Sequence, residues 1–556
     1  MTVRVGNLCI GSDFPVRVQS MANTDTNDTQ ACIEQALRIA GAGGELVRFT
    51  AQGRKEAENL KKIKEGLRSR GCHVPLVADI HFNPEAAFLA AAIVEKVRIN
   101  PGNFIDKRAD FTYIDYTEEE YRNELARLRE KLVRLIGICK EYGTALRIGV
   151  NHGSLSDRIM SRYGDTPAGM VESAMEFGRI CLEEGFDQVV FSMKSSNVRV
   201  MVQAYRLLVR GMDAEGMAFP LHLGVTEAGD GEDARVKSAA GIGALLADGL
   251  GDTIRVSLTE PPENEIPVAR KLTAYFAGEE KAIPIADGMN YSPYEYRQRK
   301  SEKSGNIGGG QPPVVVVRAG QERFDALEPK PDYFWNDGDV LLWTAMGPKD
   351  LSGDCIRLLR NEPEQVIVLE PGSLHEQRAF FLRLMSEGLN NPVIIKRTYA
   401  EDDLETLQLK AAADVGPLFL DGFGDGIWIE NKNDTITPEQ ISSLSFAILQ
   451  AARVRVSRTE YIACPGCGRT LFHLTETLAR VRAVTSHLRG LKIGVMGCIV
   501  NGPGEMADAD YGYVGAGPGK ITLYKGKDVV KRNIPQDQAL EELVSLLKKE
   551  GVWIEK

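Results

Sequence analysis

The first 260 residues repeat one pattern of apolar and polar positions. A short run rich in β-branched residues ends in polar or glycine-rich residues, and a stretch with helical periodicity follows, such as 34–40 or 171–182. Eight such runs occur, at 14–21, 44–51, 74–82, 95–103, 144–153, 187–196, 219–229 and 251–260. Strands that alternate with helices form parallel sheets, so eight units predict an α/β fold with a closed (β/α)8 TIM barrel. An open doubly wound sheet is the alternative, because the number of strands alone does not prove closure.

The pattern changes after the barrel. Residues 275–312 are polar, charged and rich in Gly, Ser and Pro, which is typical of a linker. Residues 313–440 again indicate α/β structure, with apolar runs at 312–320, 339–347, 364–372, 391–400 and 416–431, but without convergent cations. We expect a structural or spacing insert here.

A capping box, Thr437-Pro438-Glu439-Gln440, predicts a helix from this point to about Arg455. The predicted domains are therefore a substrate-binding barrel at 1–274, a linker and α/β insert at 275–440, and a C-terminal α/β domain at 441–556.

The composition narrows the class of protein. The chain has 556 residues, of which 43% are hydrophobic and 26% charged, as in ordinary soluble multidomain proteins. Its 67 basic and 77 acidic residues give a net charge of −10, which argues against a general nucleic-acid or membrane binder. No apolar run approaches the roughly 20 residues of a membrane span. The N-terminus lacks the features of a signal or transit peptide, so we expect a cytoplasmic protein.

The polar residues of the first eight strands gather at the strands' C-terminal ends. TIM barrels place their active sites at this face. Five cations among these residues predict a site for a strongly anionic ligand such as a phosphate or diphosphate. For any single cation, a structural ion pair is as good an explanation as an anion site. For all five cations together, it is a poorer explanation. Glu227 is a carboxylate in a basic mouth and therefore a candidate proton carrier. The residues are Arg48, Asp79, His81, Arg98, Asn100, Arg147, Asn151, Lys194, Glu227, Arg255 and Ser257.

Three of the nine cysteines have motif-like spacing. Cys464 and Cys467 form a Cys-x-x-Cys pair whose glycines allow both thiolates to face one metal, and Cys498 follows thirty-one residues later. A structural zinc site would need a second closely spaced pair of ligands, which is missing around Cys498. His473 and His487 lie in a helical stretch and are poor candidates. The other six are expected to be small core residues: Cys9, Cys32, Cys72, Cys139, Cys181 and Cys355.

Three thiolates suit a [4Fe–4S] cluster with one iron left over. Glu505 follows Cys498 by seven residues, across a predicted tight turn at 501–504, and could be the fourth ligand. A carboxylate is a hard, exchangeable ligand beside three soft thiolates, so such an iron could bind a substrate oxygen. The Cys-x-x-x-Cys-x-x-Cys signature of radical adenosylmethionine enzymes is absent.

These motifs together resemble one family. They are "VQSM", "DIHFN", "VRINPGN", "RIGVNHGSL", "SMKSS", "LGVTEAG", "CPGCGR" and "GCIVNGPGE". The chain closely resembles the 4-hydroxy-3-methylbut-2-enyl diphosphate synthases of the non-mevalonate isoprenoid pathway, through the barrel and the C-terminal domain. The insert resembles the long, three-domain form found in plants and some bacteria. The family's strands begin a little further upstream, so the chain is expected to be slightly clipped at its N-terminus.

The resemblance implies a reductive ring-opening by an iron–sulfur oxidoreductase. The substrate would be 2-C-methyl-D-erythritol 2,4-cyclodiphosphate and the product (E)-4-hydroxy-3-methylbut-2-enyl diphosphate. Ferredoxin or flavodoxin would deliver two electrons singly. The cluster would be held in the C-terminal domain and would serve the barrel of its own chain or that of a partner in a homodimer.

The resemblance also implies roles for single residues. Glu227 would be the proton donor, and Asp79, His81 and His152 would support the site. Arg255 stands beside Ser257 in a geometry that suits forked bonding of a diphosphate. The cluster ligands would be Cys464, Cys467, Cys498 and Glu505, and the diphosphate-binding residues would be Arg48, Arg98, Arg147, Asn151, Lys194, Arg255 and Ser257.

Two other readings remain at this point. One is a non-enzymatic, anion-binding barrel with a structural zinc site, which would be colourless where an iron–sulfur protein is brown. The other is a siroheme-type sulfite or nitrite reductase, which would need a fourth cysteine near Cys498.

Overall fold

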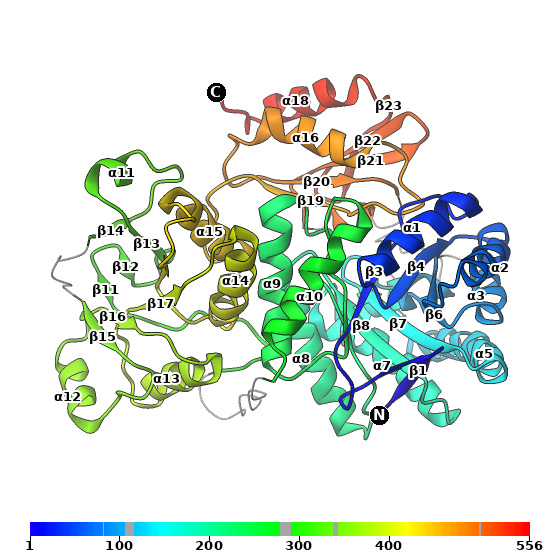
Figure 1. Ribbon diagram of the computed structural model, residues 1–556, viewed down its shortest axis with the longest axis horizontal. Coiled ribbons are helices and arrows are strands. Elements are labelled where there is room, and N and C mark those ends of the chain that lie inside the picture. The colour runs from blue at the N-terminus through cyan, green and yellow to red at the C-terminus, as the bar shows by residue number, and fades with distance from the viewer. Residues whose placement is uncertain are drawn as a thin grey trace. The chain divides into compact units, whose positions relative to one another are not determined.

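The eight predicted runs form eight parallel strands in a computed structural model of the protein (Figure 1). The structure describes residues 1–81, 83–105, 116–278, 291–336, 343–499, 502–506 and 508–555. The strands pair in the order β8-β7-β6-β5-β4-β3-β10-β9, and a parallel bridge between Phe191 and Leu221 joins β8 to β9. The sheet is therefore closed, and the TIM barrel is confirmed over the open sheet. The strands are β3 (Arg17–Met21), β4 (Leu46–Ala51), β5 (Leu76–Ile80), β6 (Lys96–Ile99), β7 (Ala145–Asn151), β8 (Val189–Lys194), β9 (His222–Leu223) and β10 (Thr253–Ile254).

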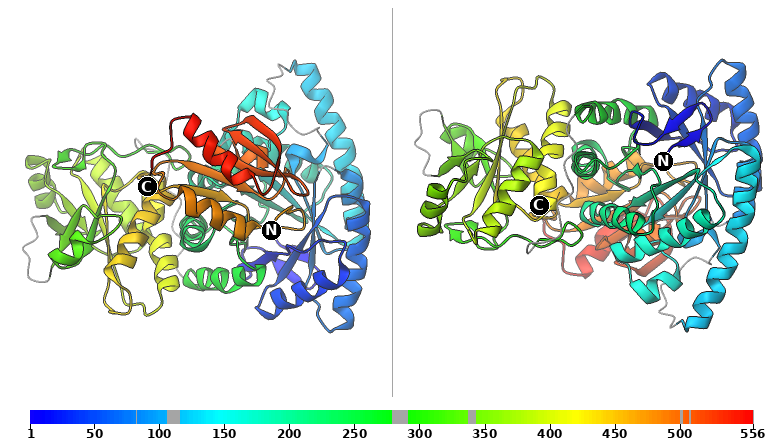
Figure 2. Two further views of the ribbon diagram at one scale, coloured as in Figure 1. Left: turned by 90° about the horizontal axis from the view of Figure 1, so that it is seen from above. Right: turned by 90° about the horizontal axis from the view of Figure 1, so that it is seen from below.

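Helices follow the barrel strands, and many start at a capping side chain. Asp28, Asn83 and Thr117, for example, each accept a hydrogen bond from a backbone N–H in the first turn of the helix that follows. The long helix α5 runs along the outside of the barrel (Figure 2). The helices are α1 (Thr29–Gly41), α2 (Arg54–Ser69), α3 (Pro84–Ala91), α4 (Pro101–Phe104), α5 (Glu118–Tyr142), α6 (Asp157–Tyr163), α7 (Pro167–Glu183), α8 (Val198–Ala214), α9 (Gly231–Ala247), the 3-10 turn η1 (Pro262–Asn264) and α10 (Glu265–Tyr275). None of the helices in the described ranges is long and apolar enough to span a membrane.

A short hairpin that the sequence pattern did not reveal precedes the barrel. Its strands are β1 (Val3–Val5) and β2 (Leu8–Ile10), which pair antiparallel. Their apolar side chains form one buried cluster with Leu46, Val77 and Ala145, which start β4, follow the start of β5 and start β7. The hairpin thus covers the N-terminal end of the barrel, and the C-terminal end is the one left for a ligand.

The C-terminal residues form a mixed five-stranded sheet in the order β19-β20-β21-β22-β23. The first three strands run parallel, and the last two are added antiparallel. The predicted tight turn at 501–504 is different in the structure, because Gly502 to Glu505 form one helical turn, α17, while Asn501 lies outside the described residues. The elements are β19 (Glu460–Ala463), α16 (Leu474–Thr485), β20 (Lys492–Met496), α17 (Gly502–Glu505), β21 (Tyr511–Gly517), β22 (Lys520–Lys525), β23 (Asp528–Pro535) and α18 (Ala539–Lys549).

The chain divides into two compact units. The first holds residues 1–231, 250–273 and 458–556, so the barrel strands and the C-terminal sheet belong together. The second holds residues 232–249 and 274–457. The second unit therefore continues past the predicted boundary at 440, and the helix that starts after the Thr437 capping box, α15, belongs to it.

The second unit contains a six-stranded, fully parallel sheet in the order β14-β13-β18-β17-β16-β15. This agrees with the predicted α/β insert, although β14 was not anticipated. Its elements are β11 (Lys303–Ser304), β12 (Ile307–Gly308), β13 (Val314–Arg318), α11 (Gln321–Asp325), β14 (Tyr333–Trp335), β15 (Thr344–Met346), α12 (Gly353–Asn361), β16 (Ile367–Leu369), α13 (Leu374–Ser386), β17 (Val393–Tyr399), α14 (Leu404–Leu420), β18 (Gly426–Asn431) and α15 (Pro438–Ala451).

Two local predictions for this unit were wrong. The apolar run 416–431 predicts strand structure throughout, but its first residues complete α14 and only Gly426–Asn431 form β18. Composition predicts a linker over 275–312, but within it Arg299 is buried and donates hydrogen bonds to the carbonyls of Leu389 and Asn391. Composition indicates a linker because these residues are polar, yet Arg299 and Ser301 direct their polar atoms to the domain itself. Residues 279–290 lie outside the described part of the chain.

Candidate active site

One pocket in the first unit combines the barrel mouth with the C-terminal domain. Nearly all of the residues predicted from the strand ends line it, together with the three cysteines. The barrel contributes Arg48, Asp79, His81, Arg98, Arg147, Asn151, Lys194, Glu227, Arg255 and Ser257, and the C-terminal domain contributes Cys464, Cys467, Arg469 and Cys498. The two predicted halves of the site thus meet within one chain.

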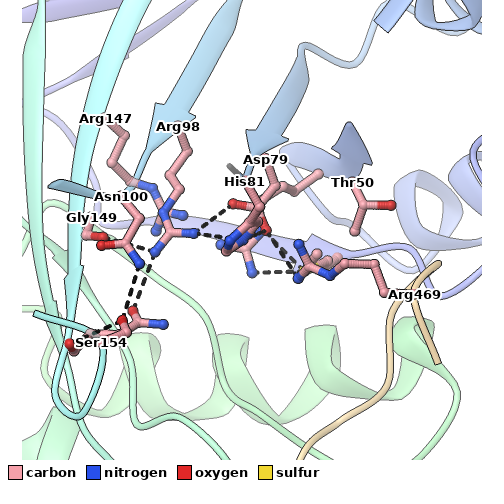
Figure 3. Close-up of polar contacts among 12 residues, drawn as sticks. Thr50, Asp79, His81, Arg98, Asn100, Arg147, Gly149, Ser154 and Arg469 are labelled. Atoms are coloured by element: carbon pink, nitrogen blue, oxygen red, sulfur yellow. Dashed lines mark hydrogen bonds and ion pairs between the residues drawn. The ribbon is translucent and has the colours of Figure 1, made fainter. Parts of the chain in front are cut away.

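Asp79 is the carboxylate around which several cations gather (Figure 3). Arg98 donates from Nη1 to Asp79 Oδ1 at 3.0 Å, and Arg469 approaches the other carboxylate oxygen with Nη2 at 3.7 Å. Burial alone would raise the pKa of Asp79, but Arg98, Arg48 and His81 outweigh it and hold that pKa well below its usual value. Asp79 therefore stays charged and compensates part of the positive charge in the mouth.

His81 is neutral in this environment. Burial, with Arg469 beside it, lowers the pKa of His81 to about 3. Its Nε2 lies 3.0 Å from Arg98 Nη1 and can accept a hydrogen bond from it. His81 and Asp79 therefore orient Arg98 from one side.

The rest of Arg98 is held by the next strand. Its Nη2 donates to the Gly149 carbonyl at 2.8 Å and lies 3.3 Å from the Asn151 side-chain oxygen. A Cβ on Gly149 would stand 2.5 Å from Arg98 Nε, so only glycine leaves room for the guanidinium. Arg98 is thus largely committed to protein partners.

Three other cations have far fewer partners. Among the described residues, the guanidinium of Arg48 bonds only to the sulfur of Met21, at 2.8 Å from Nη2, and that of Arg147 has one long hydrogen bond of 3.5 Å to the Ser192 hydroxyl. The Lys194 ammonium has no hydrogen-bond or ion-pair partner among the residues that the structure describes.

Burial and mutual repulsion make it costly to keep these three side chains charged. Burial, only partly offset by Asp79, lowers the pKa of Arg48 to about 10. Burial and then the neighbouring arginines lower the pKa values of Arg147 and Lys194 well below their usual range. Uncompensated buried cations at one mouth favour an anionic ligand.

Arg255 already has a carboxylate partner within the barrel. Its fork is already occupied, because Nη2 and Nε donate to the two carboxylate oxygens of Glu265 at 2.7 and 3.0 Å. Ser20 donates to the same carboxylate at 2.6 Å. Forked bonding of a diphosphate by Arg255 stays a prediction, and only its Nη1 is not bound by Glu265. Arg255 and Ser257 both line the pocket.

Glu227 lies at a strained position where the two domains join. It is buried and has φ of 47°, a left-handed conformation that few non-glycine residues adopt and that is common at active sites. The next residue, Ala228, forms a parallel bridge with Ala463, and the Gly229 N–H donates to the Ala463 carbonyl at 3.3 Å. The segment that carries Glu227 thus pairs with the end of β19, the strand that directly precedes Cys464.

A barrel threonine fixes this junction further. The Thr259 hydroxyl lies 2.9 Å from the Gly229 carbonyl and 3.1 Å from the Cys464 carbonyl, and it can donate to either. The Thr259 N–H also donates to the Gly229 carbonyl at 3.0 Å. The candidate proton carrier and the first cysteine are therefore held in one backbone network.

The three cysteines occupy neighbouring loops of the C-terminal sheet. Cys464 follows β19, Cys498 follows β20, and the Gly497 N–H donates to the Cys464 sulfur at 3.3 Å. Gly466 has φ of +80°, and the Cys467 N–H donates to the Thr470 hydroxyl at 3.0 Å, which together form the turn between the paired cysteines. Burial raises the pKa of the Cys464 thiol above its usual value.

This donor set fits a cluster better than a single ion. In the described part of the chain, no three His, Cys, Asp or Glu side chains converge as they would around one metal ion. A four-iron cluster binds each ligand through a different iron, so its ligands stand apart around a common space. Three thiols that line one pocket match that arrangement.

Glu505 is buried beside the barrel rather than in the pocket lining. Burial and then the nearby Glu227 carboxylate raise the pKa of Glu505 well above its usual value, while a hydrogen bond with Ser196 opposes this. A cation or metal near Glu505 would remove this penalty.

Close backbone contacts hold Glu505 at this place. The helical turn before it meets the barrel at Gly153, where a Cβ would stand 2.4 Å from the Gly504 carbonyl oxygen. Gly468 makes a similar approach, with its Cβ position 2.5 Å from the Thr24 carbonyl oxygen. Glycine is required where two backbones approach this closely.

Two predicted polar residues lie elsewhere. His152 is not in the pocket lining and instead faces Asp165, with Nε2 3.3 Å from Oδ1, so its supporting role at the site stays a prediction. Asn100 caps α4 by accepting a hydrogen bond from the Gly102 N–H at 3.1 Å. Of the six cysteines expected in the core, Cys32, Cys139 and Cys181 are buried, whereas Cys9, Cys72 and Cys355 are partly exposed.

The sequence interpretation missed Arg469. It is buried, it lines the pocket, and the thiol of Cys467 and the carboxylate of Asp79 raise its pKa against the effect of burial. The signal was present, because Arg469 follows directly after the Cys-x-x-Cys pair and its glycine. A cation next to predicted thiolate ligands could have been chosen on charge alone.

A cation-rich TIM-barrel mouth, completed by a domain with three thiols, defines a barrel enzyme for an anionic substrate. Two family models match the chain in these regions: "GcpE TIM-barrel domain" over residues 1–270 and "GcpE protein C-terminal domain" over residues 460–549. The protein belongs to the GcpE family.

Relatives match the chain over its whole length, including the insert. A protein of Phocaeicola vulgatus is 52% identical over 100% of this chain and 98% of its own. A protein of Porphyromonas gingivalis is 51% identical over 100% and 97%, and one of Akkermansia muciniphila is 46% identical over 100% and 96%. All three are described as 4-hydroxy-3-methylbut-2-en-1-yl diphosphate synthase (flavodoxin). The long form predicted from the insert is thereby confirmed.

Proposed function

We propose that this protein opens the ring of 2-C-methyl-D-erythritol 2,4-cyclodiphosphate reductively to give (E)-4-hydroxy-3-methylbut-2-enyl diphosphate. The observation that carries this proposal is the single pocket in which under-compensated cations face three cysteine thiols. The full-length similarity to synthases of this product supports the assignment. The reaction consumes two electrons and one proton, releases one diphosphate oxygen from carbon, and expels a hydroxyl as water.

Three cations anchor the diphosphate. Arg48, Arg147 and Lys194 have the fewest protein partners, so their charges are available to the ligand. Charged hydrogen bonds to a diphosphate are strong, and they orient the ring without reacting themselves. Asn151 and Ser257 add neutral polar groups at the rim of the same pocket.

Arg98 and Arg255 are assigned a different task. Asp79, His81 and Gly149 hold Arg98, and Glu265 holds Arg255, so both guanidinium groups have fixed positions before any ligand arrives. Preorganised charges need no rearrangement when the substrate binds, which favours the transition state. We therefore place both at the site as fixed positive charges rather than as adaptable clamps.

Glu227 delivers the proton to the departing hydroxyl. Because Glu227 is buried in the pocket lining, its carboxyl group lies close to a ligand held by the cations. The junction through Ala228 and Gly229 keeps that carboxyl at the boundary between substrate and cysteines. Docking of the two domains also excludes water from this space.

Cys464, Cys467 and Cys498 would hold a [4Fe–4S] cluster, with Glu505 as the fourth ligand. The cluster, when bound, supplies electrons one at a time and an exchangeable iron site. Because the relatives' names specify flavodoxin, we assign flavodoxin rather than ferredoxin as the electron donor. The pocket is complete within one chain, so no partner subunit is needed to bring thiols to the barrel.

Anaerobic purification and turnover test this function. The protein should be brown, contain iron and sulfide, and convert the cyclodiphosphate to the linear diphosphate with dithionite and methyl viologen as reductant. Glu505→Cys should keep the colour and lose most turnover, because a fourth thiolate does not exchange for a substrate oxygen. Cys355→Ser, at a partly exposed cysteine of the insert, is the control and should change neither. A colourless protein that contains zinc would favour the anion-binding scaffold instead.

A further inference from the structure

A second group of polar side chains lies beneath the cations of the barrel mouth. Lys96 stands two residues before Arg98 on β6, so both side chains leave the same face of that strand. Gln19 stands in the same way two residues before Met21 on β3, and Met21 lines the pocket. His222 lies at the start of β9. These three side chains are all fully buried, with 0% exposure.

Unsatisfied polar atoms are concentrated in this group. Lys96 Nζ, both side-chain amide atoms of Gln19 and Nε2 of His222 have no hydrogen-bond partner among the described residues. A buried ammonium without a partner is among the most costly groups a protein can hold.

The neighbours of Lys96 increase this cost. The titratable groups that face it are Arg147 of β7, Arg48 of β4 and His222 of β9, and no carboxylate is among them in the described part of the chain. Burial, with Arg147 and Arg48 adding to it, places the pKa of Lys96 well below its usual value. A neutral amine is the form that this environment favours when the mouth is empty.

An anionic ligand reverses that balance. A diphosphate bound by Arg48 and Arg147 would neutralise the same two charges that oppose a proton on Lys96. The two phosphorus-bound ionisable oxygens of a cyclic diphosphate are of the diester type and stay charged, so the ligand brings a dianion. Ring opening adds one further negative charge, because a diphosphate oxygen is released from carbon.

We propose that Lys96 is a charge-compensating residue, which carries no proton while the barrel mouth is empty and takes one up from water when the cyclic diphosphate binds. This rests on the substrate assigned above. The proton remains on Lys96 Nζ during the reaction and is separate from the proton that Glu227 delivers. The protonated amine then supports the additional negative charge of the linear product. The alternative is an ammonium that is always charged and is solvated by buried water between Gln19 and His222.

Calorimetry in buffers with different ionisation enthalpies distinguishes these two states. The cyclodiphosphate is titrated into the oxidised holoenzyme without reductant, so that binding occurs without turnover, at several pH values from neutral to mildly alkaline. The dependence of the heat on the buffer gives the number of protons taken up per ligand. Because the ligand's own charge does not change in this range, those protons are bound by the protein.

The wild-type protein should take up more protons than Lys96→Met, with a difference that approaches one per site. Lys62→Met, at an exposed position of α2, is the matched control and should behave as wild type. Equal proton uptake by wild type and Lys96→Met would overturn the proposal. A wild-type protein that does not bind the cyclodiphosphate would overturn the proposed function, and this proposal with it.

Thermal unfolding without ligand gives a second, independent readout. A lysine that is neutral when folded and charged when unfolded contributes stability that rises with pH up to the usual lysine pKa. Wild type should therefore gain stability with rising pH relative to Lys96→Met. If Lys96→Met does not fold, Lys96→Gln, which keeps polar atoms near His222, replaces it in both measurements. Parallel pH profiles of wild type and variant would contradict a neutral Lys96.

Discussion

The protein contains two fully parallel sheets whose strands carry cationic side chains with very different partners. In the insert, Lys396 of β17 lies between Glu370 at 3.4 Å and Glu430 at 3.9 Å, and its ammonium stands 4.7 Å from the centre of the Trp428 ring. In the barrel, Arg147 and Lys194 occupy comparable places with almost no partners. Lys396 thus has carboxylate partners within the insert, whereas the side chains of Arg147 and Lys194 have none within ion-pair distance among the described residues.

The two sheets also differ in what packs against their strands. In the insert, Trp428 lies in a buried apolar cluster, with Tyr333, Trp335 and Trp343 packed against it. The barrel interior holds Lys96, His222 and the mouth cations at corresponding depth. A parallel α/β sheet alone therefore does not indicate an active site. Buried charge without a protein partner does indicate one, because a ligand can supply the missing partner and so stabilise the charge.

The largest effect is expected from Glu227→Gln, which tests whether the barrel mouth performs chemistry. The variant keeps the shape of the side chain but has no acidic proton. It should lower kcat by roughly 10²-fold or more and leave KM almost unchanged. Steady-state kinetics with dithionite and methyl viologen measure both constants, and Glu227→Asp, which keeps an acid, should recover part of kcat. Weak binding with normal turnover at saturation would show that Glu227 only positions the substrate.

Gly153→Ala tests whether the mouth needs the C-terminal domain in contact with it. The new methyl group would stand 2.4 Å from the Gly504 carbonyl oxygen, and φ of +77° at this residue disfavours alanine as well. Displacement of Glu505 and the cysteines by about 1 Å should cost up to about 10²-fold in kcat/KM. Gly185→Ala is the matched control, because Gly185 has φ of +59° and open space around its Cβ position. Equal loss in both variants would point to backbone strain rather than domain contact.

A pair of arginine variants separates uncompensated from compensated charge within the mouth. Arg147→Met removes a cation with few partners, so it should raise KM roughly 10- to 150-fold, equivalent to about 1.5–3 kcal/mol, without loss of stability. Arg255→Ala leaves the buried Glu265 carboxylate without its partner and should destabilise the fold by about 3–5 kcal/mol. Kinetics and denaturant unfolding of both variants measure these outcomes. The distinction fails if Arg147→Met destabilises the protein as much as Arg255→Ala.

The smallest effect is expected from Lys396→Met in the insert. The ion pairs of Lys396 are partly exposed, so solvent screening limits their contribution to about 0–1 kcal/mol of stability. Turnover and KM should match wild type, because we interpret the insert as a structural spacer. Denaturant unfolding and steady-state kinetics provide the two measurements. A change in KM would mean that the second sheet also serves the substrate, and the contrast between the two sheets would be lost.

Much of this architecture could be predicted from local patterns in the sequence. The β-branched runs predicted all eight barrel strands, because a buried parallel strand needs several apolar residues in succession. Polar residues at the ends of those runs predicted the mouth, because parallel strands all end at the same face. The spacing of Cys464, Cys467 and Cys498 predicted thiols that would lie together, and they do line one pocket.

Which of those residues are available to a ligand depends on contacts that form only in the folded chain. Arg255 and Arg147 follow the same pattern at strand ends. Glu265 binds Nε and Nη2 of Arg255, whereas no carboxylate in the described part of the chain binds Arg147 in this way. His152 follows a strand like the others but faces Asp165. The contact of Gly153 with Gly504 joins backbones from opposite ends of the chain. Periodicity depends on neighbours a few residues away in the sequence. The partner of a charged side chain depends instead on distances in space, which only the folded chain determines.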